Sequence, residues 1–190
     1  MFLINDLIAL LATNLILSRA LGTSTLFIAA GSKKNLMATA CVITFFTTIG
    51  ASAAYFIDKM LPSSVSDIRL LLYIIVIGVL YIMLLTSVYY FSRSHFEELR
   101  KFVHVSAFNC AVIGTLFTIN EKASMNGNIY DLGDYLVAGI ESGAGFIISA
   151  LILIAAYRKL NSSKVPEAFR GFPAMLIYLG IISMAVYSLK

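Results

Sequence analysis

The sequence predicts an all-α, polytopic membrane protein with six transmembrane helices, arranged as two inverted three-helix repeats whose opening helices, the first and the fourth, are broken. Three observations predict this fold. The 190 residues are 59% hydrophobic and 13% charged, with a mean hydropathy of +0.89, which no ordinary soluble domain shows. The apolar residues form stretches long enough to cross a bilayer. Polar residues interrupt two of these stretches at corresponding places.

Six apolar stretches have about the 17 to 25 residues that a helix needs to cross the hydrocarbon core. They cover residues 3–30, 36–57, 70–91, 102–119, 135–157 and 172–189. The connections between them are short, so the chain is expected to form a single transmembrane domain over residues 1–190, embedded in the lipid bilayer. Any chemistry in water would then belong to partner proteins.

Basic residues gather on one side of the predicted membrane domain. The first, third and fifth connections carry nine of them: Lys33, Lys34, Arg93, Arg100, Lys101, Arg158, Lys159, Lys164 and Arg170. The opposite side carries Lys59, Arg69, Lys122 and Lys190 against Asp6, Asp58, Asp67, Glu121, Asp131 and Asp134. The positive-inside rule predicts that the basic side is cytoplasmic and that both termini lie outside a bacterial or archaeal plasma membrane. The net charge of +4 is then orientation charge, and no nucleic-acid partner is expected.

Each half of the chain holds three predicted crossings and opens with an interrupted one. The first repeat covers about residues 1–91, with a break over 13–25, and the second about 92–190, with a break over 106–115. An odd number of crossings per repeat inverts one repeat relative to the other, which would bring the two breaks together near the midplane. Half-helix ends there suit an ion or a cofactor, with Asn14 and Asn109 as candidate supports. The alternative is that these polar residues only bond neighbouring helices.

Glu141 lies within the fifth stretch, inside a GxxxG pattern formed by Gly139 and Gly143. The glycines predict close approach of a neighbouring helix. A carboxylate inside hydrocarbon must be protonated, paired or facing water, so Glu141 is a candidate ion-path residue. The alternative is a solvated carboxylate near the outer rim, paired with Lys122 or with water.

The two cysteines, Cys41 and Cys110, lie in separate apolar stretches and favour neither a disulfide framework nor a zinc site. By its surroundings alone, Cys41 is expected to be a small packing residue. Gly-rich nucleotide-binding loops, zinc-protease motifs and recognisable nucleophile arrangements do not occur in the sequence.

Several motifs resemble a known family, the RnfA and NqrE membrane subunits of Rnf-type ferredoxin:NAD oxidoreductases and sodium-pumping NADH:quinone oxidoreductases. Residues 108–114 read FNCAVIG, similar to the family's TNCAVLG, and residues 165–171 read VPEAFRG, similar to VPxxFRG. Residues 14–22 look like the family's NNFVLxxFLG, and residues 157–160 look like the family's IRERL. The resemblance covers nearly the whole chain, and the motif at 165–171 favours RnfA and NqrE over their sister subunits.

The resemblance implies a cofactor and partners. In the family, two homologous inverted subunits are understood to share an iron-sulfur (2Fe-2S) centre, each giving two cysteines, and Cys110 matches one of them. The family's other cysteine lies in LGLCPF, where residues 21–27 read LGTSTLF, so Ser24 or a neighbour stands in its place. Three possibilities stay open: a cluster with Cys110, Ser24 and two partner cysteines, a cluster with altered ligation, or no cluster.

The sequence and the resemblance together lead to a functional hypothesis. The chain would be one subunit of a redox-driven, ion-translocating complex that helps electrons cross the membrane and couples them to Na⁺ or H⁺ movement. Its partners would be an inverted RnfE- or NqrD-like subunit, together with proteins bearing flavin and iron-sulfur groups. The alternative is a non-redox transporter or assembly scaffold of the same fold that has lost the cluster. An independent small ion channel is a third hypothesis.

Overall fold

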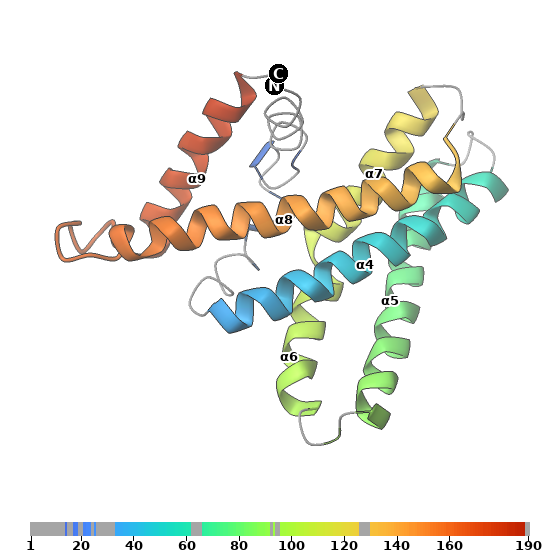
Figure 1. Ribbon diagram of the computed structural model, residues 1–190. Coiled ribbons are helices and arrows are strands. Elements are labelled where there is room, and N and C mark those ends of the chain that lie inside the picture. Colours follow the sequence, from blue (N-terminus) through green and yellow to red (C-terminus); the bar gives the residue numbers. More distant parts are fainter. Residues whose placement is uncertain are drawn as a thin grey trace.

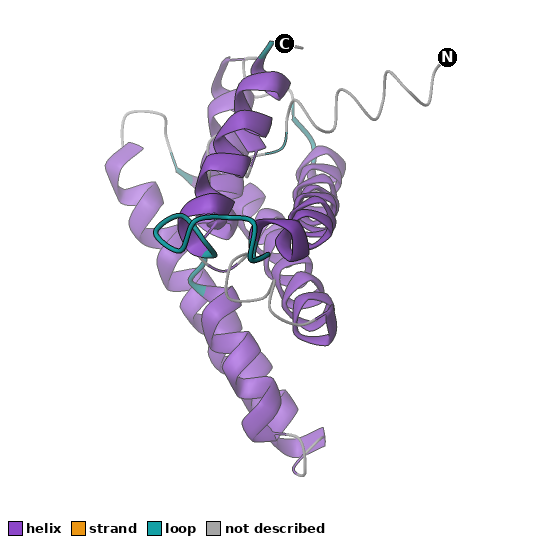
Figure 2. Ribbon diagram, turned by 90° about the vertical axis from the view of Figure 1, so that its left-hand side faces the viewer, coloured by secondary structure: helices purple, strands orange, loops and turns teal. Residues whose placement is uncertain are grey.

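In the part of the chain that it describes, the computed structural model consists of helices joined by loops, with no strand (Figures 1 and 2). It describes residues 14, 17–18, 21–23, 25, 33–61, 66–91, 93, 96–125 and 130–188. The helices that it describes in full are α4 (Lys33–Met60), α5 (Ser66–Phe91), α6 (Phe96–Ala107), α7 (Cys110–Met125), α8 (Leu132–Leu160) and α9 (Phe172–Tyr187).

Five of the six predicted stretches correspond to these helices. Helices α4, α5, α8 and α9 match four of them within a few residues, while the fourth stretch is divided into α6 and α7. Within the described residues, four segments are long and apolar enough to cross a membrane: 35–60, 68–91, 96–125 and 132–157. Helix α9 is shorter, with 16 residues. The chain is a multi-pass membrane protein. Most of the first stretch lies outside the described residues, so the count of six crossings and the inverted repeat remain predictions.

The broken fourth helix is present, and the break is narrower than predicted. Only Phe108 and Asn109 leave the helical conformation between α6 and α7. The helix also begins earlier than the predicted position 102, at Phe96. Its first turn carries Glu97 and Glu98, whose negative charge stabilises a helix N-terminus. Residues 96–101 read FEELRK, and the four charged residues among them are poor membrane residues, which is why hydropathy alone misses this turn.

Helices α4 and α8 lie side by side and run in opposite directions (Figure 1). Small residues make their contact close. A Cβ added to Gly139 would lie 2.7 Å from the Cα of Thr48 and 2.8 Å from the carbonyl oxygen of Thr47, and one on Gly143 would overlap Thr44. The threonine hydroxyls bond carbonyls of their own helix, for instance Thr44 to Ala40 at 2.8 Å. This α4–α8 seam therefore packs backbone against backbone with its hydroxyls satisfied, as the GxxxG pattern predicts.

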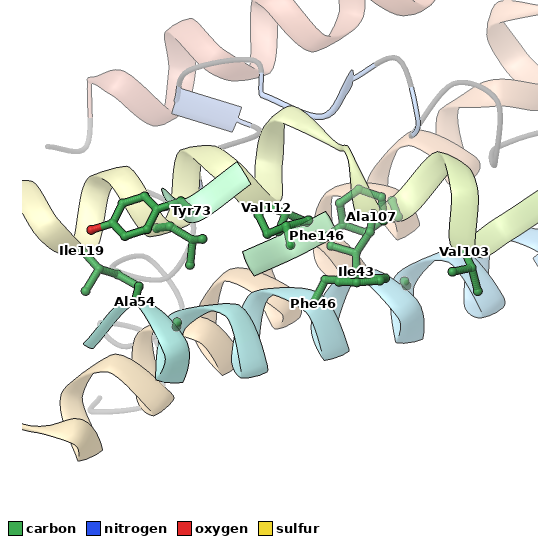
Figure 3. Packing of buried hydrophobic residues seen from close by; sticks show 14 of the residues in the cluster. Ile43, Phe46, Ala54, Tyr73, Val103, Ala107, Val112, Ile119 and Phe146 are labelled. Atoms are coloured by element: carbon green, nitrogen blue, oxygen red, sulfur yellow. The ribbon is translucent and has the colours of Figure 1, made fainter. Parts of the chain in front are cut away.

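The core lies where α4 meets α6, α7 and α8. Ile43 and Phe46 of α4 pack against Val112 of α7 and Phe146 of α8, and all four are at most 1% exposed (Figure 3). Helix α5, by contrast, presents large apolar side chains such as Ile75, Ile82 and Met83 to its surroundings. Exposed apolar residues of this kind suit contact with lipid or with a membrane partner.

Residues 161–171 form the loop between α8 and α9, seen at the front of Figure 2. The guanidinium of Arg170 donates hydrogen bonds to the carbonyls of Val165 at 3.1 Å and Ser163 at 3.4 Å, which folds the loop back on itself. Gly171 then has φ of 81°, a conformation that favours glycine, and α9 begins at the next residue. These contacts give the FRG end of the VPEAFRG motif a structural reason.

Candidate functional site

The candidate site is built on the break between α6 and α7. Asn109 caps the new helix: its backbone carbonyl accepts the N–H of Val112 at 3.0 Å, and its side-chain Oδ1 accepts the N–H of Ala111 at 2.9 Å. An asparagine is among the best residues for this position, because its side chain satisfies a backbone donor that the helix cannot. The break therefore ends in an ordered helix start with Cys110 as its first residue.

Asn14 plays a similar part in the first break. Its carbonyl accepts the N–H of Ser18 at 2.8 Å, and its Oδ1 accepts the N–H of Leu17 at 3.4 Å. Its amide nitrogen also reaches α8, donating to the carbonyl of Gly145 at 2.7 Å and to the hydroxyl of Ser149 at 2.8 Å. Asn14 is 6% exposed. It thus holds the first break against α8 as well as supporting its own turn.

The two breaks lie against each other, as the sequence predicts. Gly22 of the first break has φ of 80°, and a Cβ there would lie 2.9 Å from Oδ1 of Asn109 and 2.8 Å from the Cβ of Ala111. A Cβ on Gly114 would likewise overlap the side chain of Leu21. Gly22 is therefore required twice, for its backbone conformation and for the closeness of its neighbours. Residues from distant parts of the sequence meet here inside the membrane domain.

Two hydrogen-bond donors at the second break have no partner among the described residues. The Nδ2 of Asn109 and the Oγ of Ser106 are buried there without a hydrogen bond, in residues that are 3% and 0% exposed. Leaving a buried donor unpaired costs about 1–3 kcal/mol. Such groups are uncommon in folded proteins and each calls for an acceptor beyond the described residues. The second break is therefore where buried hydrogen-bond donors stay unsatisfied by the described residues.

Cys110 is exposed on the surface of the chain, directly beside the buried Asn109. Its thiol is therefore accessible to a neighbouring molecule in the membrane plane. Ser24, the residue at the place of the family's second cysteine, lies outside the described residues. Cys41 is also exposed, on α4, so the expectation that it fills a packed interior is wrong. The membrane environment explains this error, because an apolar sequence context there includes lipid-facing positions as well as core positions.

Glu141 is exposed on α8, near the level of the α4–α8 seam. The hydroxyl of its neighbour Ser142 forms a hydrogen bond of 2.6 Å with the hydroxyl of Thr115 in α7. Ser142 therefore joins α8 to the helix that begins at Cys110. Glu141 itself forms no ion pair with Lys122 or any other residue that the structure describes. The predicted alternative of a Lys122 pair is therefore not what the structure shows, and its carboxylate faces the surroundings of the chain.

Sequence reasoning missed part of this neighbourhood. Tyr81 of α5 forms a hydrogen bond of 2.8 Å with Nδ1 of His104, and its ring also packs against Phe108 at the break. It also missed Gly22 as a residue of special conformation, although the glycine that ends the first broken segment was a signal. The unpaired hydroxyl of Ser106 has no sequence signal, because serine in a membrane helix usually bonds its own backbone.

Residues 5–190 match the Rnf-Nqr subunit family of membrane proteins. The chain belongs to this family. Similar proteins include the A subunits of three complexes. That of the Na⁺-translocating ferredoxin:NAD⁺ oxidoreductase complex of Acetobacterium woodii is 23% identical over 93% of this chain and 90% of the relative. That of the ion-translocating oxidoreductase complex of Aeromonas hydrophila is 25% identical over 92% and 89%. Its counterpart from Aromatoleum aromaticum is 24% identical over 95% and 91%.

These matches span about nine-tenths of both partners, so the Rnf-Nqr chain is similar to its relatives from end to end. The family agrees with the resemblance drawn from the motifs. It also agrees with an all-helical membrane fold, which the described residues show directly.

Proposed function

We propose that this chain is the RnfA-type subunit of an ion-translocating oxidoreductase complex, and that the paired breaks form its contribution to electron transfer across the membrane. The observation that carries this proposal is the contact of Gly22 with Asn109 and Ala111, which brings both breaks to one place beside an exposed thiol. The relatives named above are subunits of such complexes, over nearly their full length. The complex would lie in a prokaryotic plasma membrane with the basic connections inside.

The residues at the breaks fit one ligand of an iron-sulfur centre. Iron in such centres is held mainly by thiolates. Cys110 offers a thiol that a partner can reach, and the unpaired donors on Asn109 and Ser106 would suit a nearby electron-rich acceptor. The first break brings no thiol, because residues 14–25 contain no cysteine. A 2Fe-2S centre here would therefore take Cys110 from this chain and draw its other ligands largely from an inverted RnfE- or NqrD-like partner.

Each residue of the site has a part in this proposal. Cys110 would hold the group, which when bound accepts and donates single electrons. Asn109 and Asn14 fix the two half-helix starts, and Gly22 lets the breaks approach. Glu141, exposed on the neighbouring helix and joined to α7 through the Ser142–Thr115 bond, is the candidate residue for the path of Na⁺ or H⁺. Flavin, ferredoxin and NAD chemistry would lie on the soluble and membrane partners.

The decisive experiment compares Cys110→Ala with Cys41→Ala in the purified complex. Both cysteines are exposed and belong to helices, so the substitutions are matched in chemistry and differ in position. Cys110→Ala is expected to remove an EPR-active iron centre and electron transfer while the protein stays in the complex, and Cys41→Ala to leave both unchanged. A maleimide reagent should label Cys110 in the isolated chain and fail to label it in the iron-loaded complex.

A second function has one observation in its favour, the absent cysteine of the first break. In that case the chain keeps the family's fold as a non-redox transporter or assembly scaffold. Iron content and turnover that are both indifferent to Cys110→Ala would establish this second function and overturn the redox role. Coding sequences for flavin-bearing and ferredoxin-like subunits beside that of this chain would support the first.

A further inference from the structure

A second polar cluster lies at the Met60 end of α4, away from both breaks. Its members come from four helices: Asp58 of α4, Arg69 and Tyr73 of α5, Asn120 of α7 and Tyr135 of α8. The hydroxyl of Tyr73 donates to Oδ1 of Asp58, and the hydroxyl of Tyr135 donates to Oδ2 at 2.9 Å. The carboxylate is thus held at both oxygens by neutral donors from two different helices. We call this group the Asp58 cluster.

The carboxylate of Asp58 has no cationic partner among the described residues, although two cations lie close by in the fold. Arg69 is 7% exposed and directs its guanidinium to neutral oxygens instead, donating to the carbonyl of Leu61 at 3.1 Å and to Oδ1 of Asn120 at 3.4 Å. Its Nε has no hydrogen-bond partner in the described part of the chain. Lys59 binds the hydroxyl of Tyr55 at 3.3 Å. A half-buried carboxylate in a membrane protein therefore has hydrogen bonds and no ion pair.

The ligand that would complete this arrangement is a cation. Charged groups inside proteins are stable when they are paired or bind a metal ion. At Asp58 the cluster offers carboxylate and phenol oxygens, which are hard ligands suited to hard cations. The amide oxygen of Asn120 and the carbonyl oxygen of Leu61 already accept from Arg69 and are not counted as ligands. The buried guanidinium of Arg69 disfavours a second positive charge nearby, and more strongly for a divalent ion than for a monovalent one.

We infer that the Asp58 cluster is a binding site for a monovalent cation, with Asp58 as its charged ligand, Tyr73 and Tyr135 orienting the carboxylate, and Arg69 weakening the affinity so that the ion can leave. This inference rests on the proposed ion-translocating function, for which it supplies a site on the side opposite to the basic connections. It concerns residues away from Cys110, and it can be tested without electron transfer.

The test measures the thermal midpoint of the purified complex while NaCl replaces choline chloride at constant ionic strength. A ligand that binds the folded state raises this midpoint with its concentration. The wild-type complex is expected to show a Na⁺-dependent rise, and Asp58→Asn to lose it. Asp131→Asn is the matched control, because Asp131 is an exposed carboxylate just before α8 and asparagine serves equally well at a helix start.

Arg69→Gln gives an independent test in the opposite direction. Glutamine keeps a donor for the Leu61 carbonyl and removes the charge, so half of the Na⁺ effect should occur at a concentration lower by about tenfold. An identical Na⁺ response in wild type, Asp58→Asn and Arg69→Gln overturns the inference. Iron content and electron transfer, measured on the same samples, separate the two proposals: a Na⁺ response that depends on Asp58 in a complex without iron supports the cation site and refutes the redox role.

Discussion

The α4–α8 seam and the paired breaks both depend on glycines that let neighbouring segments approach closely, yet they treat polar groups differently. In the seam, Gly139 and Gly143 meet threonines whose hydroxyls bond their own helix. At the breaks, Gly22 meets Asn109, whose Nδ2 has no partner among the described residues. The polar groups of the seam are satisfied within the seam, whereas the breaks keep polar atoms that the described residues do not pair. Substitutions in the two regions should therefore have different consequences for stability and for activity.

The largest loss of stability is expected from Gly139→Ala in the seam. The added Cβ would meet the backbone of Thr47 and Thr48 at less than 3 Å, and backbone cannot move aside as a flexible side chain can. We expect a loss of about 3 kcal/mol, seen as a lower thermal midpoint and a smaller monodisperse yield in detergent. Gly78→Ala in α5 is the control, because its Cβ would meet nothing within 4 Å. Equal behaviour of the two variants would mean that the seam is not closely packed.

Gly22→Ala should lower stability less and activity more. Alanine at φ of 80° is strained by about 1–2 kcal/mol, and its Cβ would press on Asn109 and Ala111. Helix content by circular dichroism should stay near that of the wild type, while electron transfer by the complex falls. Gly171→Ala has a similar φ of 81° and open space around it, so it reports the strain alone. If the two variants are equally active, the contact between the breaks has no functional role.

Asn14→Ala removes hydrogen bonds to the Gly145 carbonyl and the Ser149 hydroxyl. The Gly145 carbonyl keeps a second donor in Ser149, at 2.9 Å, so the loss should be about 1–2 kcal/mol. Thermal unfolding of Asn14→Ala, Ser149→Ala and the double variant would measure the coupling between these residues. Strictly additive losses would show that Asn14 and Ser149 do not act together.

The smallest change in stability, and one of opposite sign, is expected from Ser106→Ala. Its buried hydroxyl has no partner among the residues that the structure describes, so removing it should leave stability unchanged or raise it by about 1 kcal/mol. Thr47→Ala in the seam removes a hydroxyl that bonds Ile43 at 3.0 Å and should not be stabilising. A Ser106→Ala complex that is more stable and less active would support a functional hydroxyl, and a destabilised one would show that the hydroxyl has a structural partner.

The sequence predicted the membrane class and most helix positions, because hydropathy over about 20 residues depends on bilayer thickness and little on tertiary packing. It also predicted the second break, where Asn109 and Cys110 interrupt an apolar run, and the close approach at Gly139. Burial was harder to predict. Arg69 counts among the charges of the connections, yet it is buried and bonds the carbonyl of Leu61, just after α4, and Asn120 of α7, which only the folded chain brings together.

Local sequence also failed to predict where interiors and lipid faces lie. Cys41 and Phe46 stand in the same apolar helix, but the first is exposed and the second is buried. In a soluble protein, the spacing of apolar residues along a helix would distinguish the buried position from the exposed one. In a bilayer both faces of a helix are apolar, so this spacing carries little information about burial. The roles proposed for Cys110, Ser24 and Glu141 would depend on partner subunits, which one chain's sequence does not contain.

The small hydrophobic cluster of Leu17, Leu179 and Val186 has a consequence for biosynthesis. Leu17 leaves the ribosome well before its two partners, which belong to α9. Leu17 therefore cannot complete its packing until α9 has been made. Contacts between distant parts of a chain close late and slowly. The surface of Leu17 would meanwhile be open to insertion factors or to another membrane protein, so association with a partner can begin before α9 has been made.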